Sequence, residues 1–200
     1  MKLSQIPGLE DLKEKLFRNA ESGKVAHAQL FAGQEGSGNL ALAIAYATIL
    51  NCTDRVSDDA CGVCPSCQKI SKYIHPDLHF VFPVSSTKNV TGKNVVSDNY
   101  INSWRSFVNQ HPFGTATEWI QEFGGEDKQL NISREESRNI LKKLTLKSFE
   151  GTYKVMIIWL AEYMHSSAAN ALLKLLEEPP ERTCNTGSKQ DHYEEKATHI

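Results

Sequence analysis

Short apolar runs alternate with helical patterns along this chain, and the alternation constrains the fold more than any other feature. The runs that predict strands cover residues 28–32, 78–82 and 153–160. Helical patterns cover residues 9–22, 39–50, 168–178 and a segment that begins with a capping box at Ser133. Strands separated by helices imply a parallel sheet covered by helices on both faces. We therefore expect an α/β fold in which 28–32 is a buried strand.

Composition excludes several classes of protein. The chain has 200 residues, enough for one full domain or two small ones. Lys plus Arg number 22 and Asp plus Glu 24, so the formal charge of −2 gives no basic excess of the kind found in nucleic-acid binders. The longest apolar-leaning run, 40–50, is far shorter than the roughly 20 residues of a membrane-spanning helix. The first residues have no apolar core of the signal-peptide type, so we expect a cytoplasmic protein with no membrane contact.

A cluster of cysteines predicts a metal site. Four of the five cysteines lie within 16 residues, at Cys52, Cys61, Cys64 and Cys67. In a reducing compartment such a cluster favours metal over disulfides, and the C-x2-C spacing lets two sulfurs of one turn reach the same tetrahedral ion. We expect structural zinc; an iron–sulfur cluster is the other option that four thiolates allow. With four cysteines present, His75 is expected to lie in a loop and not to bind the metal.

The glycine-rich turn after the first strand has the layout of a phosphate-binding loop without its chemistry. Gly33 and Gly38 occupy the glycine positions of G-x-x-x-x-G-K-[ST], with Gly36 between them. Asn39 stands at the lysine position and offers no positive charge, and Leu40 at the Ser/Thr position offers no oxygen to Mg²⁺.

A second set of replacements follows the strand at 153–160. An ATPase places an Asp–Glu pair there to hold Mg²⁺ and activate water. This chain has Trp159 and Leu160 instead. We therefore expect a scaffold with no catalytic residues and no bound ATP.

Several sequence blocks, taken together and in order, resemble the clamp-loader ATPase subunits of bacterial DNA polymerase III. They include 27–33, the four-cysteine module, His75-Pro76-Asp77 and Glu150-Gly151-x-Tyr153-Lys154-Val155. The last block runs from Ser167 to Pro180 and ends in Glu177-Glu178-Pro179-Pro180. The resemblance covers about residues 5–183. It implies an AAA+ α/β domain over 1–183, with a zinc module inserted at about 51–70.

Two segments depart from that pattern. The polar segment at about 85–130 is interpreted as an insertion packed on the domain surface, so that its deletion should leave a folded domain; contact with another replication protein is the alternative. Tyr100, Trp104, Phe107 and Val108 could form one apolar helix face in it. Residues 184–200 show no periodicity, and we expect an irregular, non-native tail.

Within the family, the missing lysine and acidic pair resemble the non-hydrolysing delta-prime branch, the stationary part of the loader. The resemblance implies gamma/tau and delta subunits as partners, primer–template DNA within the assembly, and indirect contact with the sliding clamp. The arginine that delta-prime lends to its neighbour lies in a Ser-Arg-Cys motif that this chain does not contain, and Arg182 comes too early for it. The later lid and collar domains are absent, which suggests an N-terminal fragment. The alternatives are a divergent gamma/tau-type ATPase and a free-standing zinc-dependent nucleic-acid binder.

Overall fold

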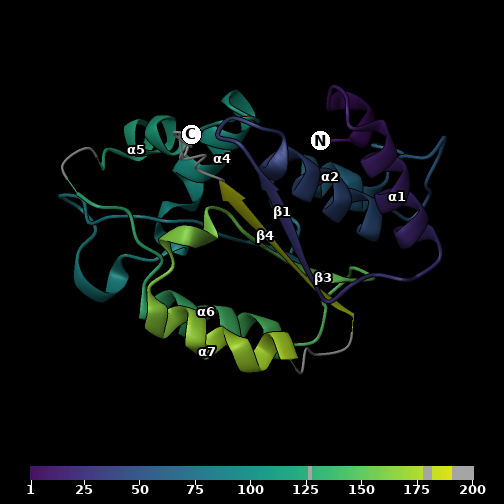
Figure 1. The fold of residues 1–200 in the computed structure, drawn as a ribbon. Coiled ribbons are helices and arrows are strands. Elements are labelled where there is room, and N and C mark those ends of the chain that lie inside the picture. The colour runs from purple at the N-terminus through teal and green to yellow at the C-terminus, as the bar shows by residue number, and fades with distance from the viewer. Residues whose placement is uncertain (126–127, 178–181, 191–200) are drawn as a thin grey trace, which may run out of the picture.

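A parallel sheet organises the chain, as the alternation of strands and helices predicts. The computed structural model describes residues 1–125, 128–177 and 182–190. Within these residues one sheet has the order β1-β4-β3-β2, and every pairing is parallel. Its strands are β1 (Ala28–Gly33), β2 (Leu78–Val81), β3 (Lys154–Ile158) and β4 (Thr183–Gln190). The expected α/β fold is confirmed (Figure 1).

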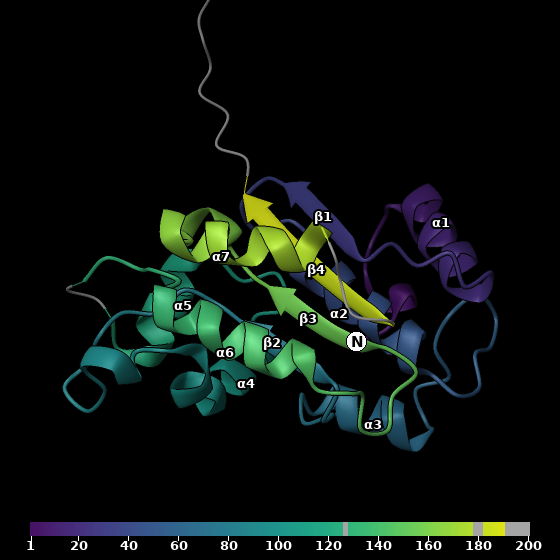
Figure 2. The same cartoon turned by 90° about the horizontal axis from the view of Figure 1, so that it is seen from below.

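Helices cover both faces of this sheet. The α-helices are α1 (Glu10–Glu21), α2 (Asn39–Asn51), α3 (Pro65–Ser71), α4 (Ile101–Gln110), α5 (Ala116–Phe123), α6 (Arg134–Thr145) and α7 (Ser166–Glu177). Short 3-10 turns are η1 (Leu3–Gln5), η2 (Gly92–Asn94), η3 (Ser97–Tyr100) and η4 (Ala161–Tyr163). Figure 1 shows α1 and α2 on one face and α6 and α7 on the other, and Figure 2 shows the same layers from below. No helix in the described part of the chain is long and apolar enough to cross a membrane.

Helix α2 forms the centre of the core. All of its residues after Asn39 are buried, because its small and apolar side chains carry no polar face. It packs against β1, β3 and β4. Since α2 begins at the glycine loop and ends one residue before Cys52, one buried helix fixes both candidate sites relative to the sheet.

Residues 184–190 correct the expectation of an irregular tail. They belong to β4, which lies between β1 and β3 and pairs with both. Cys184 and Thr186 are fully buried, yet Asn185 and Thr186 have buried side-chain polar atoms without a hydrogen-bond partner. The backbone ladder to two neighbours holds this strand, and ladder bonds leave no side-chain periodicity in the sequence. Residues 191–200 lie outside the described residues.

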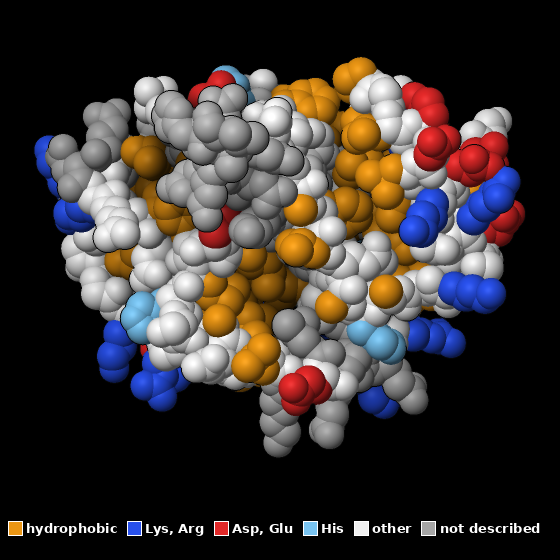
Figure 3. All heavy atoms as spheres, in the orientation of Figure 1, with side chains coloured by type: hydrophobic (Ala, Val, Ile, Leu, Met, Phe, Trp, Pro, Cys, Tyr) orange, Lys and Arg blue, Asp and Glu red, His pale blue; other side chains and the backbone are white. Residues whose placement is uncertain are grey.

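Strand β1 corrects a second expectation, because it lies at the edge of the sheet. Phe31 is buried, whereas Leu30 is 64% exposed. A cavity of about 450 Å³ borders this strand between the sheet and α7, lined mainly by apolar residues such as Leu30, Ile158 and Leu172. It appears as an apolar hollow in Figure 3. The apolar run at 28–32 thus predicted the strand correctly but not its burial.

The 85–130 segment also differs from its prediction, because it is part of the core. Trp104, Phe107 and Trp119 are all fully buried. The Trp104 ring stacks on Phe82 at 4.2 Å between centroids, and Trp119 Nε1 donates to the Pro83 carbonyl at 2.7 Å. Phe82 and Pro83 directly follow β2, so α4 and α5 close the carboxyl end of that strand. The predicted apolar face of α4 is confirmed, but the interpretation of a surface insertion is wrong.

Candidate metal centre and glycine loop

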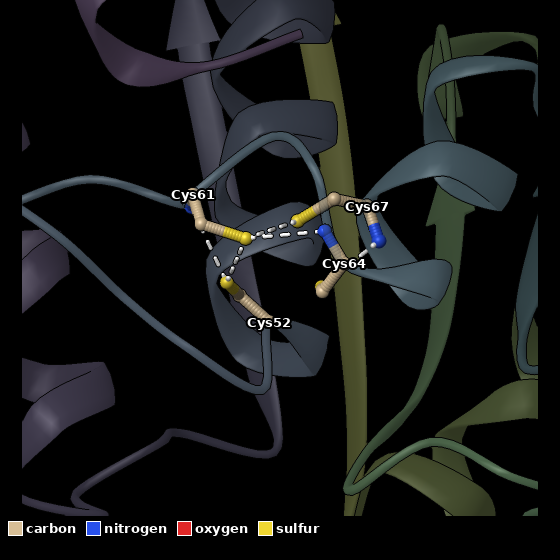
Figure 4. A group of neighbouring side chains, drawn as sticks. All are labelled: Cys52, Cys61, Cys64 and Cys67. Carbon is tan, nitrogen blue, oxygen red and sulfur yellow. Dashed lines mark hydrogen bonds between the residues drawn. The ribbon is translucent and has the colours of Figure 1, made fainter.

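Four cysteine sulfurs converge beyond the end of α2. Cys52 follows the last residue of α2, Cys61 lies in the loop, Cys64 caps α3 and Cys67 lies in its first turn. Pro65 suits the first position of α3, and Gly62 has φ of +77°, which favours glycine. The ligand atoms of the four residues all lie within 4.8 Å of one another (Figure 4). The structure therefore brings together the full predicted cysteine set.

The sulfur geometry fits one tetrahedral ion. Cys52 and Cys61 sulfurs lie 3.6 Å apart, and Cys61 and Cys67 sulfurs lie 4.0 Å apart. Tetrahedral zinc with Zn–S bonds of about 2.3 Å needs sulfurs roughly 3.8 Å apart. Backbone N–H groups of Cys61, Cys64 and Cys67 donate to the sulfurs of Cys52, Cys61 and Cys64 at 3.3–3.4 Å. Such donors stabilise thiolates, the form that binds metal.

The charges of the cluster also favour a bound cation. Burial alone would raise the pKa of Cys64, but N–H donors, including that of Cys67, outweigh it and lower the pKa to about 6. Burial and neighbouring thiols raise the pKa of Cys67. Four thiolates this close repel one another unless a positive ion lies between them. A divalent metal with four sulfur ligands has no open position, so its role would be structural.

Two carboxylates, the buried Asp59 and the exposed Glu150, connect the cysteine module to the rest of the fold. Asp59 accepts hydrogen bonds from the backbone N–H groups of Leu3, Ser4 and Ala60 at 2.7–3.1 Å. On the other side, Lys69 of α3 pairs with Glu150 at 2.6 Å. Metal binding by the module would thereby also order η1 and the loop before β3.

Asp77 and Asn51 are structural residues to which the sequence patterns assigned no role. Asp77 is 1% exposed and accepts from the N–H groups of Phe149, Glu150 and Gly151 at 2.7–2.8 Å. Asn51 donates to the Tyr153 carbonyl and accepts from the Tyr153 N–H. Their partners are more than 70 residues away in the chain. The sequence does point to the Asp77 contact in one way: Asp77 and its partners Glu150 and Gly151 lie in two of the blocks that carry the family resemblance.

His75 makes contacts away from the cysteines. Its Nδ1 accepts from the Asp77 N–H at 3.1 Å, and its Nε2 lies 3.6 Å from Glu150 Oε1. Burial lowers the pKa of His75, with the nearby carboxylates acting in the opposite direction. It belongs to the contacts that join β2 to the loop before β3.

The glycine loop between β1 and α2 turns its own side chains inward. A Cβ placed on Gly33 would lie 2.7 Å from Ser37 Oγ and 2.8 Å from Asn39 Oδ1, so both side chains fold over the first glycine. Gly36 has φ of +74°. Leu40 is 3% exposed and belongs to the core. Asn39 has no positive charge at the lysine position, and Leu40 has no oxygen for Mg²⁺ at the Ser/Thr position.

The positions of the missing acidic pair are also filled by core residues. Trp159 is 3% exposed, and its ring centroid lies 5.2 Å from that of Trp104 and 5.5 Å from that of Phe107. Leu160 is fully buried, and its N–H donates to Ser188 Oγ at 3.4 Å. A cavity of about 510 Å³ lies beside the glycine loop, between α1 and β1, and Lys15 contributes a cation to its mainly apolar lining.

Comparison with known proteins identifies the relatives of the chain. The family model described as "DNA polymerase III, delta subunit" matches residues 8–186. The chain is 28% identical over 181 residues to DNA polymerase III subunit delta' of Yersinia pestis, covering 90% of this chain and 41% of that protein. It is 26% identical to the delta' subunit of Bacillus subtilis, and the match covers 84% of this chain and 37% of that subunit. It is 25% identical to the tau subunit of Escherichia coli, and the match covers 89% of this chain and 21% of that subunit. The chain thus spans about two fifths of the length of these delta' relatives.

Proposed function

Because the chain belongs to the clamp-loader family of DNA polymerase III, we propose that it is a delta-prime-type subunit. In this role it is a non-hydrolysing, structural part of the loader, which places the sliding clamp on primed DNA during replication. Its partners are the gamma/tau and delta subunits, with primer–template DNA inside the assembly and the clamp contacted indirectly. The role belongs to the cytoplasm, where bacterial DNA is replicated.

One observation carries this proposal: core packing fills the positions that an ATPase needs for chemistry. Leu40, Trp159 and Leu160 are each at most 3% exposed and apolar. Replacement of any of them by a charged or Mg²⁺-binding residue would bury an unsatisfied polar group at a cost of several kcal/mol, on the order of 2–7. The apolar side chains that stand at the positions of catalytic residues therefore also stabilise the fold.

The cysteine cluster is proposed to hold one structural Zn²⁺. Elemental analysis of protein purified without added metal should give one zinc per chain, and Cys64→Ser should lose it. Cys184→Ala is the matched control, because Cys184 lies in β4 and outside the cluster. Iron in place of zinc, or four freely titratable thiols, would contradict the assignment.

A divergent gamma/tau-type ATPase is the second candidate function. The tau subunit of Escherichia coli matches at 25% identity, close to the 26% of the Bacillus subtilis delta' subunit. The two candidates differ in nucleotide binding, since a hydrolysing subunit must bind Mg²⁺-ATP.

Calorimetry with Mg²⁺-ATP separates them. We expect a flat trace and no ATP turnover for this chain, with a tau subunit as the positive control. A tight, Mg²⁺-dependent isotherm would favour the ATPase. Co-purification with gamma/tau and delta subunits tests the assembly role separately, and failure to associate with any of them would contradict it.

A further inference from the structure

We propose that the outer edge of β2 docks an extended acidic segment of a partner protein. A cavity of about 290 Å³ lies at this edge, between α4 and α6 (Figure 2). The described residues that line it include none of the glycine loop and none of the four clustered cysteines. The cavity is therefore separate from both candidate sites described above, and its occupant is a further partner.

Phe80 carries the unpaired backbone groups of this edge. The carbonyls of Asp77 and Val81 accept from the N–H groups of β3 and of the residue after it, so the odd-numbered residues carry the parallel ladder. The N–H and the carbonyl of Phe80 therefore point the other way, to the outer edge. In the described part of the chain, no residue bonds to either group there.

The chain itself closes this edge on both sides of Phe80. Towards the start of the strand, the Leu78 N–H donates to the His75 carbonyl at 3.1 Å. Just past its end, Ser97 Oγ accepts from the Phe82 N–H at 3.0 Å and donates to the Phe82 carbonyl at 3.1 Å. Phe80 is 3% exposed, and buried backbone groups normally have partners. One extended residue of an added strand supplies the missing donor and acceptor together.

Cations line the cavity on both faces of the sheet. Phe80 packs against Trp104 of α4, with ring centroids 5.9 Å apart, so this face is the one on which Arg105 of α4 lies. His79 points to the opposite face and lies near Lys143 of α6. Successive side chains of an added strand also alternate between the two faces, so two adjacent carboxylates would each meet a cation.

The two cations differ in their present partners. Arg105 Nε donates to the Tyr73 carbonyl at 3.1 Å, which fixes the guanidinium and leaves its Nη groups for a carboxylate. Lys143 pairs with Asp98, which also lines the cavity, at 2.5 Å. The described lining therefore keeps a net positive charge.

This charge favours an acidic partner over a second copy of the chain. Pairing of two β2 edges would bring their Arg105 and Lys143 side chains together, and like charges on adjacent strands are destabilising. Ile74 is 49% exposed and lines the cavity beside the exposed Pro76. The expected segment thus carries two acidic residues next to apolar ones.

Three blocked, fluorescein-labelled peptides test the site on the full chain by fluorescence anisotropy. The acidic peptide Thr-Val-Asp-Glu-Val-Thr should bind, and its amide counterpart Thr-Val-Asn-Gln-Val-Thr should bind at least tenfold more weakly. The third peptide is the acidic one with N-methyl groups on the backbone nitrogens of Asp and Glu. It keeps its charges but should also bind at least tenfold more weakly, because main-chain hydrogen bonds form the strand pairing.

Substitutions in the cavity should weaken binding of the acidic peptide. Arg105→Gln and Lys143→Gln should each lower the affinity about fivefold, the effect of one partly exposed ion pair. Lys147→Gln is the matched control, since Lys147 is exposed and lies outside the described lining, and it should leave the affinity unchanged.

Amide hydrogen exchange of the unmodified chain keeps the test decisive if a variant fails to fold. The acidic peptide should slow exchange of the Phe80 N–H and leave that of the Leu30 N–H unchanged. Leu30 is the control because it lies in β1, at the other edge of the sheet, where the odd-numbered His27 bonds to β4 and even-numbered residues face outward.

Three results would overturn the site. The first is equal affinity for the acidic and amide peptides, and the second is slower exchange at Leu30 in place of Phe80. The third is a dimer of the chain that the acidic peptide dissociates in sedimentation equilibrium, which would make a second copy the occupant. The delta-prime role is tested separately, by nucleotide binding and by association with loader subunits.

Discussion

Single buried side chains join segments that are far apart in this chain. Asp77 receives three backbone hydrogen bonds from the loop before β3, and Asp59 receives three from η1 and its own loop. A lone Asp in a sequence carries no sign of such partners, because the partners are backbone groups and any residue supplies them. The cysteines are different, since their spacing itself encodes the shared ligand. The metal cluster was therefore predictable residue by residue, whereas the carboxylate contacts were not.

Asp77→Asn is expected to destabilise the fold. Burial alone would raise the pKa of Asp77, but its N–H donors outweigh burial and the pKa is lowered, so the carboxylate is stabilised as an anion. The amide would turn an NH₂ group toward N–H donors and cost about 2 kcal/mol or more. Urea denaturation at pH 7 measures this change. Asp98→Asn is the control, because Asp98 is half-exposed and its ion pair with Lys143 should contribute at most about 1 kcal/mol. Equal effects of both substitutions would contradict the role of Asp77.

His79 should make the fold sensitive to acid. Burial, aided by Lys143 and Lys154 and opposed by Asp77 and Asp98, lowers the pKa of His79 to about 4. Between the ordinary histidine pKa and this value, the unfolded chain binds a proton that the folded chain does not. Stability from this residue is therefore complete above about pH 6.5 and is lost as the pH falls toward 4. The free energy of unfolding should depend less on pH in His79→Gln than in the unmodified chain. Parallel pH curves for the two would contradict the expectation.

Among the elements, α4 and α5 show how an apparently polar segment can belong to a core. The 85–130 segment has a polar overall composition, and that composition predicted an insertion on the surface. Its few aromatic residues recur at helical spacing and meet Phe82 and Trp159, which lie at strand ends far away in sequence. Composition cannot predict these ring contacts, because the contacts depend on where the fold places the last residues of β2 and β3. Ser133 shows a related limit: it caps α6 as predicted, but Glu136 is buried and accepts from the Ser97 N–H.

Truncation of Trp104 should therefore be costly. Trp104→Ala removes a fully buried ring and is expected to cost about 3–5 kcal/mol. Deletion of 85–130 should give an insoluble chain for the same reason. Phe149→Ala is the matched control, since that ring is 83% exposed and its loss should cost less than about 0.5 kcal/mol. Similar denaturation midpoints for the two variants would show that α4 packs only at the surface.

The whole molecule is a sheet whose ends are closed by different parts of the chain. The 85–130 segment covers the carboxyl ends of β2 and β3, and the cysteine module follows the far end of α2. The alternation of strands and helices predicted this parallel sheet, because three of its strands carry continuous apolar runs. It missed β4, whose buried positions include Asn185, Thr186 and Ser188, because sheet pairing and not hydrophobicity places that strand.

Metal removal tests whether the two ends are coupled. The module is tied to η1 through Asp59 and to the loop before β3 through Lys69 and Glu150. Leu3 of η1 and the adjacent Ile6 belong to the main core. A chelator should therefore lower the melting temperature of the whole chain as well as that of the module. If chelation removes only about 2 kcal/mol from the free energy of unfolding of the chain, its melting temperature should fall by roughly 4–8 °C.

Tryptophan fluorescence gives the readout, because Trp104, Trp119 and Trp159 all lie in one aromatic cluster outside the cysteine module. We expect chelation to shift the tryptophan melt and the helical circular-dichroism melt together. The shift should be smaller in Asp59→Asn, whose η1 contact is already weakened. An unchanged tryptophan melt after complete metal release would show that the module folds independently of the sheet. A shared transition would mean that the metal stabilises the sheet through its module, which joins the main core at Cys52, Cys67 and Ile70 and is tied to η1 and to the loop before β3 by Asp59 and Lys69.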